Sequence, residues 1–168
     1  MGVLILLLSL PVELAALGCS EQAVEANFSL EYMEGPVAAD RGDHLFLRIK
    51  KAAIEPGEDS AAFDYVLLQG RENSFISKET GDYTTVTDLL SRRRLKPSEL
   101  EGLMGALNKH CFWTLAAKYQ DSSILDGWYE RIRVVNGETE HQVVCVNKQK
   151  DRFQGVKDYL FETLSLVE

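Results

Sequence analysis

The sequence predicts an α+β domain, with a mainly antiparallel sheet and two principal helices packed on one face. Stretches in which apolar and polar residues alternate come first along the chain, and a helical spacing of apolar residues begins only after Pro97. An Asn-Gly pair inside a later alternating stretch also predicts a hairpin. Strands that come first and helices that come later are typical of an α+β fold.

Four strands are predicted in the first half of the chain. Apolar and polar residues alternate over residues 28–32 and again over 45–50, which is the period of a half-buried strand. Residues 62–69 and 83–90 are the third and fourth candidates, because they are rich in apolar, aromatic or β-branched residues. Turn-like sequences lie between them at residues 55–59 and 79–82.

Two helices are predicted in the second half. Pro97 suits the first position of a helix, where its missing N–H costs nothing. One apolar stripe follows at helical spacing, made of Leu100, Leu103, Met104, Leu107 and Cys111. A final helix is predicted to begin at a capping box formed by Asp151 and Gln154. Its core face is formed by Phe153, Val156, Leu160 and Leu164.

A hairpin is predicted between the two helices, with its turn at Asn136-Gly137, so that Val135 faces Glu138. Every second side chain of a strand shares a face. The face expected to meet the core carries Trp128, Ile132, Val134, His141, Val143 and Cys145. The face expected to meet water carries Arg131, Arg133, Glu138, Glu140 and Gln142.

Size and composition are those of one folded domain. The chain has 168 residues, of which 45% are hydrophobic and 26% charged, which excludes a collagen-like or wholly disordered protein. A net charge of −8 argues against binding nucleic acid through phosphate contacts. No cofactor is expected, because the glycine motifs of nucleotide-binding loops are absent. No metal site is expected, because the three histidines lie far apart and closely spaced ligand pairs are absent.

The amino terminus has the features of an export signal. The apolar run that begins at Val3 is too short to span a membrane, but it fits the hydrophobic region of a secretory signal. Small residues at Ala16 and Gly18 then provide a cleavage site directly before Cys19. We therefore predict a signal peptide over residues 1–18, a short polar tether over 19–26 and a single domain over 27–168.

The sequence Ala16-Leu17-Gly18-Cys19 resembles the lipobox of bacterial lipoproteins, with Ala16 in place of the favoured Leu and Leu17 in place of a smaller residue. The resemblance implies that the Cys19 thiol is lipidated and that the protein is anchored to a membrane, on the periplasmic or outer-surface side. The order of strands, helix, hairpin and closing helix is also similar in layout to many small bacterial lipoproteins, a similarity that carries no catalytic residues. Three alternatives stay open: secretion with an unmodified Cys19, an uncleaved anchor, and a buried first helix.

Two cysteines inside the domain are predicted to point into the core. Cys111 lies at the end of the apolar helical stripe and Cys145 on the core face of the hairpin, so they are candidates for a disulfide in an oxidising compartment. The alternative is two buried thiols that behave as small hydrophobic side chains. An unlipidated Cys19 would be a rival disulfide partner.

Two further groups of residues are candidates for function. A nucleophilic thiol at Cys111 or Cys145, with His141 as its base and Asp126 to orient it, would make a hydrolase, although neither cysteine lies in an electropositive setting. The basic cluster formed by Arg92, Arg93, Arg94 and Lys96 is a candidate contact for lipid headgroups or an acidic partner. Its simpler interpretation is a solvated connection between strand and helix.

These patterns favour binding over catalysis. The polar groups are scattered along the sequence, and no nucleophile–base pair or ligand set stands out. We therefore expect a lipid-anchored cell-envelope protein that binds or supports a partner, with the membrane and an envelope protein as its partners. The alternatives are a secreted hydrolase with a Cys/His site, and an inhibitor or assembly factor that docks through an exposed edge strand.

Overall fold

The computed structural model describes residues 19–37, 42–52, 65–77, 80, 82–123, 127–148 and 150–164. The predicted signal peptide over residues 1–18 lies outside them.

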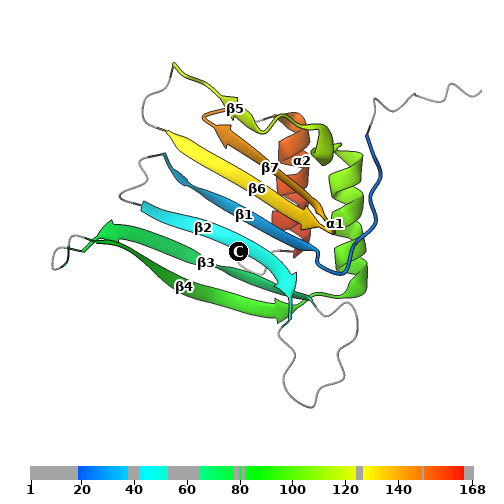
Figure 1. Ribbon diagram of the computed structural model, residues 1–168, viewed down its shortest axis with the longest axis horizontal. Helices are drawn as coiled ribbons and strands as arrows, with labels where there is room; N and C mark the ends of the chain where they lie inside the picture. Colours follow the sequence, from blue (N-terminus) through cyan, green and yellow to red (C-terminus); the bar gives the residue numbers. More distant parts are fainter. Residues whose placement is uncertain are drawn as a thin grey trace, which may run out of the picture.

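Seven strands form one sheet in the order β4-β3-β2-β1-β6-β7-β5 (Figure 1). The strands are β1 (Ser29–Pro36), β2 (Gly42–Lys51), β3 (Tyr65–Ile76), β4 (Tyr83–Arg94), β5 (Lys118–Gln120), β6 (Trp128–Asn136) and β7 (Thr139–Val146). Every neighbouring pair is antiparallel except β5 and β7, which are parallel. The predicted α+β class with a mainly antiparallel sheet is confirmed.

The helices are α1 (Pro97–Lys109) and α2 (Asp151–Asp158), and α2 continues into a π-helical segment, η2 (Tyr159–Leu164). A 3₁₀ turn, η1 (Phe112–Thr114), follows α1. Pro97 occupies the first turn of α1, as predicted, and Glu99 accepts a hydrogen bond from the backbone N–H of Lys96 at 2.8 Å. The predicted capping box at α2 is wrong, because the Gln154 side chain instead donates to Asp158 one turn further on.

The core lies between the helices and one face of the sheet. In Figure 1, α1 and α2 stand on the same side of the sheet, behind the strands. Alternate residues of the strands and the apolar stripes of both helices form one buried cluster, which includes Leu30, Tyr32, Leu47, Ile49, Leu67, Leu103, Leu107, Ile132, Val134, Phe153, Val156 and Leu160. Burial of this surface is the main driving force for folding.

The predicted hairpin is present as β6 and β7, but its turn is shifted by one residue. Asn136 pairs with Thr139, so Gly137 and Glu138 form the turn, and Val135 lies opposite Glu140 rather than Glu138. Gly137 has the positive φ of 61° that such a turn requires. Ile132 lies opposite Val143 and both point to the core, as predicted. The prediction that Trp128 meets the core is wrong, because this side chain, at the first position of β6, is 49% exposed.

The opposite face of the sheet carries a row of ion pairs that crosses the central strands. Glu31 on β1 accepts hydrogen bonds from Arg48 on β2, at 2.6 Å, and from Arg131 on β6. Arg48 also contacts Glu72 on β3 at 2.7 Å. The same guanidinium lies 4.3 Å from the centre of the Phe46 ring, which is thereby shielded from water. Cross-strand charge pairs of this kind make a sheet face compatible with solvent.

Residues 19–26 contain no helix or strand, but they are not the tether that the sequence predicted. Asn108 of α1 exchanges two hydrogen bonds with the backbone of Gln22, at 2.8 and 3.1 Å. Asn136 accepts from the N–H of Glu25 at 2.8 Å and donates to the carbonyl of Ala23 at 2.9 Å. These contacts make the segment part of the folded domain. They also satisfy the polar groups of the Asn136 side chain at the end of β6.

Gly70 is predicted to be essential for the packing of β3 against β4. A β-carbon at Gly70 would lie 2.6 Å from Cζ of Phe46 and would meet the carbonyl oxygen of Asp88, at the position where the β3–β4 register shifts. Gly70→Ala should therefore lower the free energy of unfolding by about 2 kcal/mol through overpacking. Gly105→Ala is the matched control, because a β-carbon there meets nothing within 4 Å, and it should raise stability by about 0.5–1 kcal/mol. Urea denaturation measures both, and equal effects would contradict the prediction.

Candidate functional site

The cysteines pair differently from the prediction. Cys19 and Cys111 form a disulfide with a Cα–Cα distance of 5.0 Å, and Cys145 is a buried free thiol. The predicted Cys111–Cys145 bridge is therefore wrong, and the rival partner Cys19 takes its place. Cys111 lies beyond the end of α1 with a left-handed backbone, φ 51°, so it does not continue the apolar stripe that faces the sheet.

The disulfide bears directly on the predicted lipid anchor. A sulfur atom that is bonded to a second sulfur has no valence left for a thioether to a lipid. A bridged Cys19 and a lipidated Cys19 therefore exclude each other on one chain. The described domain holds the bridged form, and lipidation of Cys19 stays a prediction for another form of the chain.

The described residues do not assemble the Cys/His site of the hydrolase hypothesis. Burial, followed by the nearby Glu130 carboxylate, raises the pKa of the Cys145 thiol to about 11, which is the reverse of what a nucleophile needs. His141 lies on the same strand as Cys145, four residues away and thus about 13 Å along it. Its ring packs against Phe112, with 5.3 Å between ring centres. Asp126 lies outside the described residues.

We predict one reactive thiol per unfolded, non-reduced chain of the mature protein, and three after reduction. In the folded protein at pH 8, Cys145 should not react, because its thiol is buried and its pKa is about 11. Peptide mapping by mass spectrometry should recover Cys19 linked to Cys111. A chain made without residues 1–18, and so retained in the cytosol, serves as the control and should show three thiols. Recovery of acylated Cys19 with a reactive Cys111 would instead identify the lipid-anchored form.

The three histidines lie in separate surroundings. His44 packs against Tyr129, with 5.4 Å between ring centres, His110 lies against Gly155, and His141 lies against Phe112. Within the described ranges, no three His, Cys, Asp or Glu side chains gather as a metal site would require. In the same ranges, no helix has both the length and the hydrophobicity needed to cross a bilayer.

A charged cluster that sequence reasoning missed lies between α2 and the sheet. Glu34 on β1 and Glu130 on β6 are opposite each other, and Lys157 of α2 donates to both, at 3.2 Å to Glu34. The Tyr32 hydroxyl lies 2.5 Å from Glu34 and 3.2 Å from Glu130. Burial, and then the hydrogen bond to Glu34, raises the pKa of Tyr32 above its usual value. The sequence held a signal for this cluster, because both glutamates occupy core-facing positions of alternating strands.

The cluster connects α2 to the sheet. Lys157 is the cation that both carboxylates contact, and it also lies 5.6 Å from the centre of the Tyr32 ring. Only 6% of the Glu130 side-chain surface is exposed. A charge buried to this extent destabilises the fold unless it is paired, so the cluster stabilises one placement of α2 on the sheet.

Lys157→Met is predicted to leave two neighbouring carboxylates without their cation. The free energy of unfolding should fall by about 2–3 kcal/mol, less than for a fully buried pair because Lys157 and Glu34 each keep 20% of their side-chain surface exposed. The further change Glu130→Gln should recover part of this loss. Lys148→Met, at an exposed position, is the control and should change stability by less than about 0.5 kcal/mol. Urea denaturation at pH 7 separates these outcomes, and a loss no larger than that of the control would show that the cluster is not structural.

The predicted basic cluster is divided between the two faces of the sheet. Arg93 points to the helix side, where it contacts Glu99 at 2.8 Å and donates to the carbonyl of Leu164 at 2.8 Å. The Arg93 guanidinium lowers the pKa of Glu99. Lys96 directly precedes α1. Arg92 and Arg94 remain exposed on the opposite face, and Arg94 and Lys50 flank Val66 there. Arg93 therefore contributes to the stability of the fold rather than to a surface for a partner.

The edge strand β4 is the most prominent exposed feature. It is 12 residues long, and among the described strands it pairs only with β3. Val86, Leu89 and Leu90 are large apolar residues of β4 with 52%, 50% and 47% of their surface exposed. Phe75 and Ile76 of β3 add exposed apolar surface, and the β3–β4 hairpin extends beyond the start of β2 (Figure 1). An exposed, long and apolar edge strand is a template for pairing with another chain.

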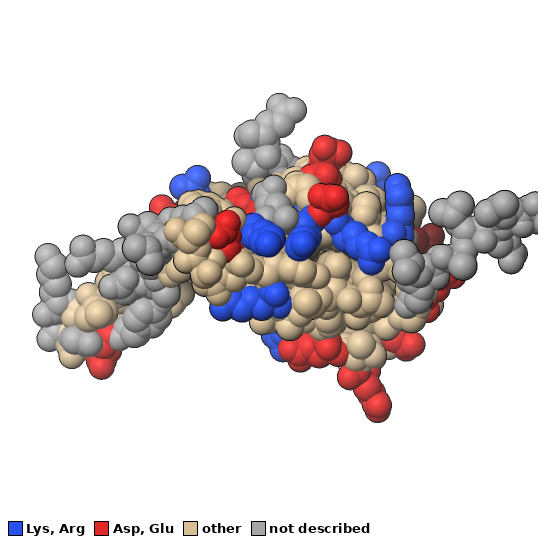
Figure 2. All heavy atoms as spheres, turned by 90° about the horizontal axis from the view of Figure 1, so that it is seen from above, with Lys and Arg blue, Asp and Glu red and all other residues tan. Residues whose placement is uncertain are grey.

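The other edge of the sheet is protected. Strand β5 is only three residues long and begins at the exposed Lys118. Figure 2 looks onto this edge and shows a row of Lys and Arg side chains across it, with acidic side chains on either side. Short length and charge are the usual means by which a protein prevents an edge from pairing. Of the two edges, β4 is therefore the one that remains open to a partner strand.

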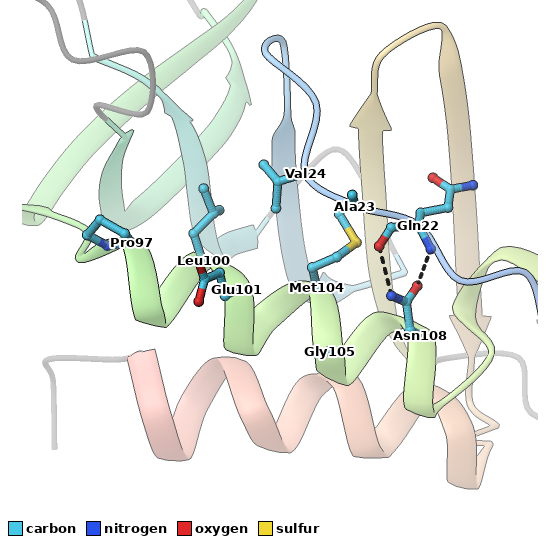
Figure 3. Close-up of a pocket in the computed structure, with 9 residues that line it drawn as sticks. All are labelled: Gln22, Ala23, Val24, Pro97, Leu100, Glu101, Met104, Gly105 and Asn108. Carbon is cyan, nitrogen blue, oxygen red and sulfur yellow. Dashed lines mark hydrogen bonds between the residues drawn. The ribbon is translucent and has the colours of Figure 1, made fainter.

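A groove of about 480 Å³ lies between the N-terminal segment and α1 (Figure 3). Its apolar lining includes Val24, Leu100 and Met104, and the paired hydrogen bonds between Gln22 and Asn108 lie at one end of it. Leu100 and Met104 are each only 4% exposed, so the groove offers little apolar surface to a ligand. It is a weaker candidate than the β4 edge.

Comparison with known proteins adds no functional assignment. No family model matches the chain, and no curated protein matches its sequence.

Proposed function

We propose that the protein is an exported domain of the bacterial cell envelope that acts by docking a partner strand along β4, and not by catalysis. The observation that carries this proposal is the open β4 edge, on which Val86, Leu89 and Leu90 are about half exposed. A strand that adds to such an edge gains backbone hydrogen bonds, while the exposed side chains provide selectivity.

The disulfide supports the exported location. Disulfides persist outside the cytosol and are rare inside it. The Cys19–Cys111 bridge closes a loop with a sequence separation of 92 residues, and such a loop is expected to stabilise a fold by about 4–5 kcal/mol. The bridge also accounts for a cysteine directly after the predicted cleavage site without a lipid. We propose the bridged chain as the folded mature form, with the lipid-anchored chain as its alternative.

The layering of the fold is consistent with a docking role. Because both helices pack on one face of the sheet, the surfaces open to a partner are the opposite face and the edges of the sheet. That opposite face is occupied by ion pairs such as Glu31–Arg48. Because these charged side chains are already paired within the protein, they have little remaining capacity to bind a partner. The β4 edge differs, because the outer backbone groups of an edge strand are unpaired within the sheet.

In-cell photo-cross-linking tests the docking role. A photo-reactive amino acid at position 90 of the exported protein should give a covalent adduct of defined mass, whereas the same amino acid at the exposed position 101 of α1 should give none. Leu89→Lys places a charge beside the contact and should lower the adduct yield about ten-fold, which corresponds to about 1.4 kcal/mol. Equal yields from positions 90 and 101, or no adduct at all, would contradict the proposal.

A further inference from the structure

We infer that residues 19–24 form a redox-controlled strap, which the Cys19–Cys111 disulfide holds over an apolar surface of α1 and which reduction of the disulfide releases. The inference goes beyond the proposed function, because it involves none of the residues of the β4 edge. The strap contains no helix or strand. One end of it is attached through Cys19 to Cys111, two residues beyond the end of α1, and the other end continues through Glu25 into the domain.

The strap covers apolar side chains of α1. Leu100 and Met104 each keep only 4% of their surface exposed, and Ala23 and Val24 of the strap line the same groove. Val24 packs against the core cluster, and the Met104 side chain extends from α1 toward the strap (Figure 3). Because the strap forms one wall of the groove and α1 the other, removal of the strap exposes apolar surface of α1 to solvent.

Two asparagines donate or accept the hydrogen bonds that hold the strap. Asn108 of α1 exchanges two with the backbone of Gln22. Asn136 donates to the Gln22 side chain at 3.1 Å and to the carbonyl of Ala23 at 2.9 Å. Each of these bonds replaces a hydrogen bond to water, so its net contribution is modest. The disulfide differs, because it keeps Cys19 beside α1 even while the hydrogen bonds are broken. We therefore assign control of the strap to the disulfide.

The chain beyond the strap is attached independently of the disulfide. The N–H of Glu25 donates to Asn136 at 2.8 Å. The Tyr65 hydroxyl donates to the carbonyl of Glu25 at 3.2 Å and lies 3.3 Å from that of Ala26. Phe28, only 1% exposed, belongs to the core cluster. Opening of the strap therefore stops at Glu25, and the domain stays folded when the strap is released.

The disulfide is accessible to a reductant. Cys19 and Cys111 are half-buried, whereas the Cys145 thiol is buried. A small dithiol attacks one sulfur atom of the bridge as a thiolate, and the second thiol of the same molecule then displaces the protein from the mixed disulfide. Two electrons and two protons pass to the protein, which leaves thiols at Cys19 and Cys111 and a disulfide in the reductant. Because this exchange is reversible, reoxidation closes the strap again.

Hydrogen exchange of single amides, followed by NMR, tests the release of the strap. The N–H of Gln22 donates to Asn108. It should exchange at least ten-fold faster in the exported variant Cys19→Ser/Cys111→Ser than in the oxidised wild type. The N–H of Phe28 donates to the carbonyl of Glu25 at 3.1 Å, beyond the strap, and should exchange within two-fold of its wild-type rate. Wild type reduced with dithiothreitol should match the variant, and reoxidation should restore the slow exchange of Gln22.

Oxidation by hydrogen peroxide, followed by mass spectrometry of peptides, tests whether the apolar surface becomes accessible. Met104 should form its sulfoxide at least five-fold faster in the variant without the disulfide, because peroxide then reaches its sulfur atom. Met33, 8% exposed and on the opposite face of the sheet, is the internal control and should react at an unchanged rate. Asn108→Ala keeps the disulfide but removes both hydrogen bonds to Gln22, and it should leave Met104 oxidation within two-fold of the wild type.

Each outcome supports or overturns the inference. Unchanged exchange of Gln22, or unchanged oxidation of Met104, after loss of the disulfide would overturn it. Faster oxidation of both methionines would show that the whole domain opens, and would overturn it as well. If Asn108→Ala exposes Met104 as much as loss of the disulfide does, the hydrogen bonds and not the disulfide control the strap, and the inference is again rejected. Cross-linking from position 90 does not involve the strap, so the docking role of β4 is tested separately.

Discussion

The register of strand β1 is the constraint on which the rest of the structure depends. This strand is paired along both edges, with β2 on one side and β6 on the other. Tyr32 lies between Leu47 and Ile132 and points to the helices, whereas Glu31 lies between Arg48 and Arg133 on the opposite face. A slip of one residue would bury the glutamate and expose the tyrosine, because successive side chains of a strand point to opposite faces. The apolar core and the row of ion pairs thus select the same register.

The same alternation explains the buried charges next to the core. It places Glu34 on the helix side of β1, directly opposite Glu130 on β6. A carboxylate in that position requires a cation, and Lys157 supplies it from α2. Packing of apolar side chains alone would allow α2 to slide, whereas an ion pair fixes one position along its axis. We therefore interpret the cluster as the contact that fixes α2 in one position on the sheet. The raised pKa of Tyr32 is a consequence of the same packing.

Sequence periodicity predicted the elements that are local and missed the contacts that are not. The alternation of apolar and polar residues predicted β1, β2 and the β6–β7 hairpin, and Pro97 predicted the start of α1. Periodicity carries no information on which strands become neighbours, so the pairing of β1 with β6 could not be predicted. The error at Cys111 came from extending the helical stripe past Lys109, where α1 ends. The three consecutive arginines were predicted to act as one cluster because their strand was predicted to end at Leu90. A strand predicted to continue to Arg94 would have placed Arg93 on one face of the sheet and Arg92 and Arg94 on the other.

The contrast between the two sheet edges connects the fold to its function. A sheet of seven strands that does not close has two ends, and each end presents backbone groups that could pair with another chain. At β5 the protein shortens the strand and surrounds it with charge, whereas at β4 it keeps twelve residues and exposes three large apolar side chains. These side chains gain little stability within the monomer, because about half of their surface stays in water. Their surface is buried only when another strand covers β4. The exposed apolar side chains of β4, which leave this edge of the monomer open to pairing, are therefore best explained by association with a partner.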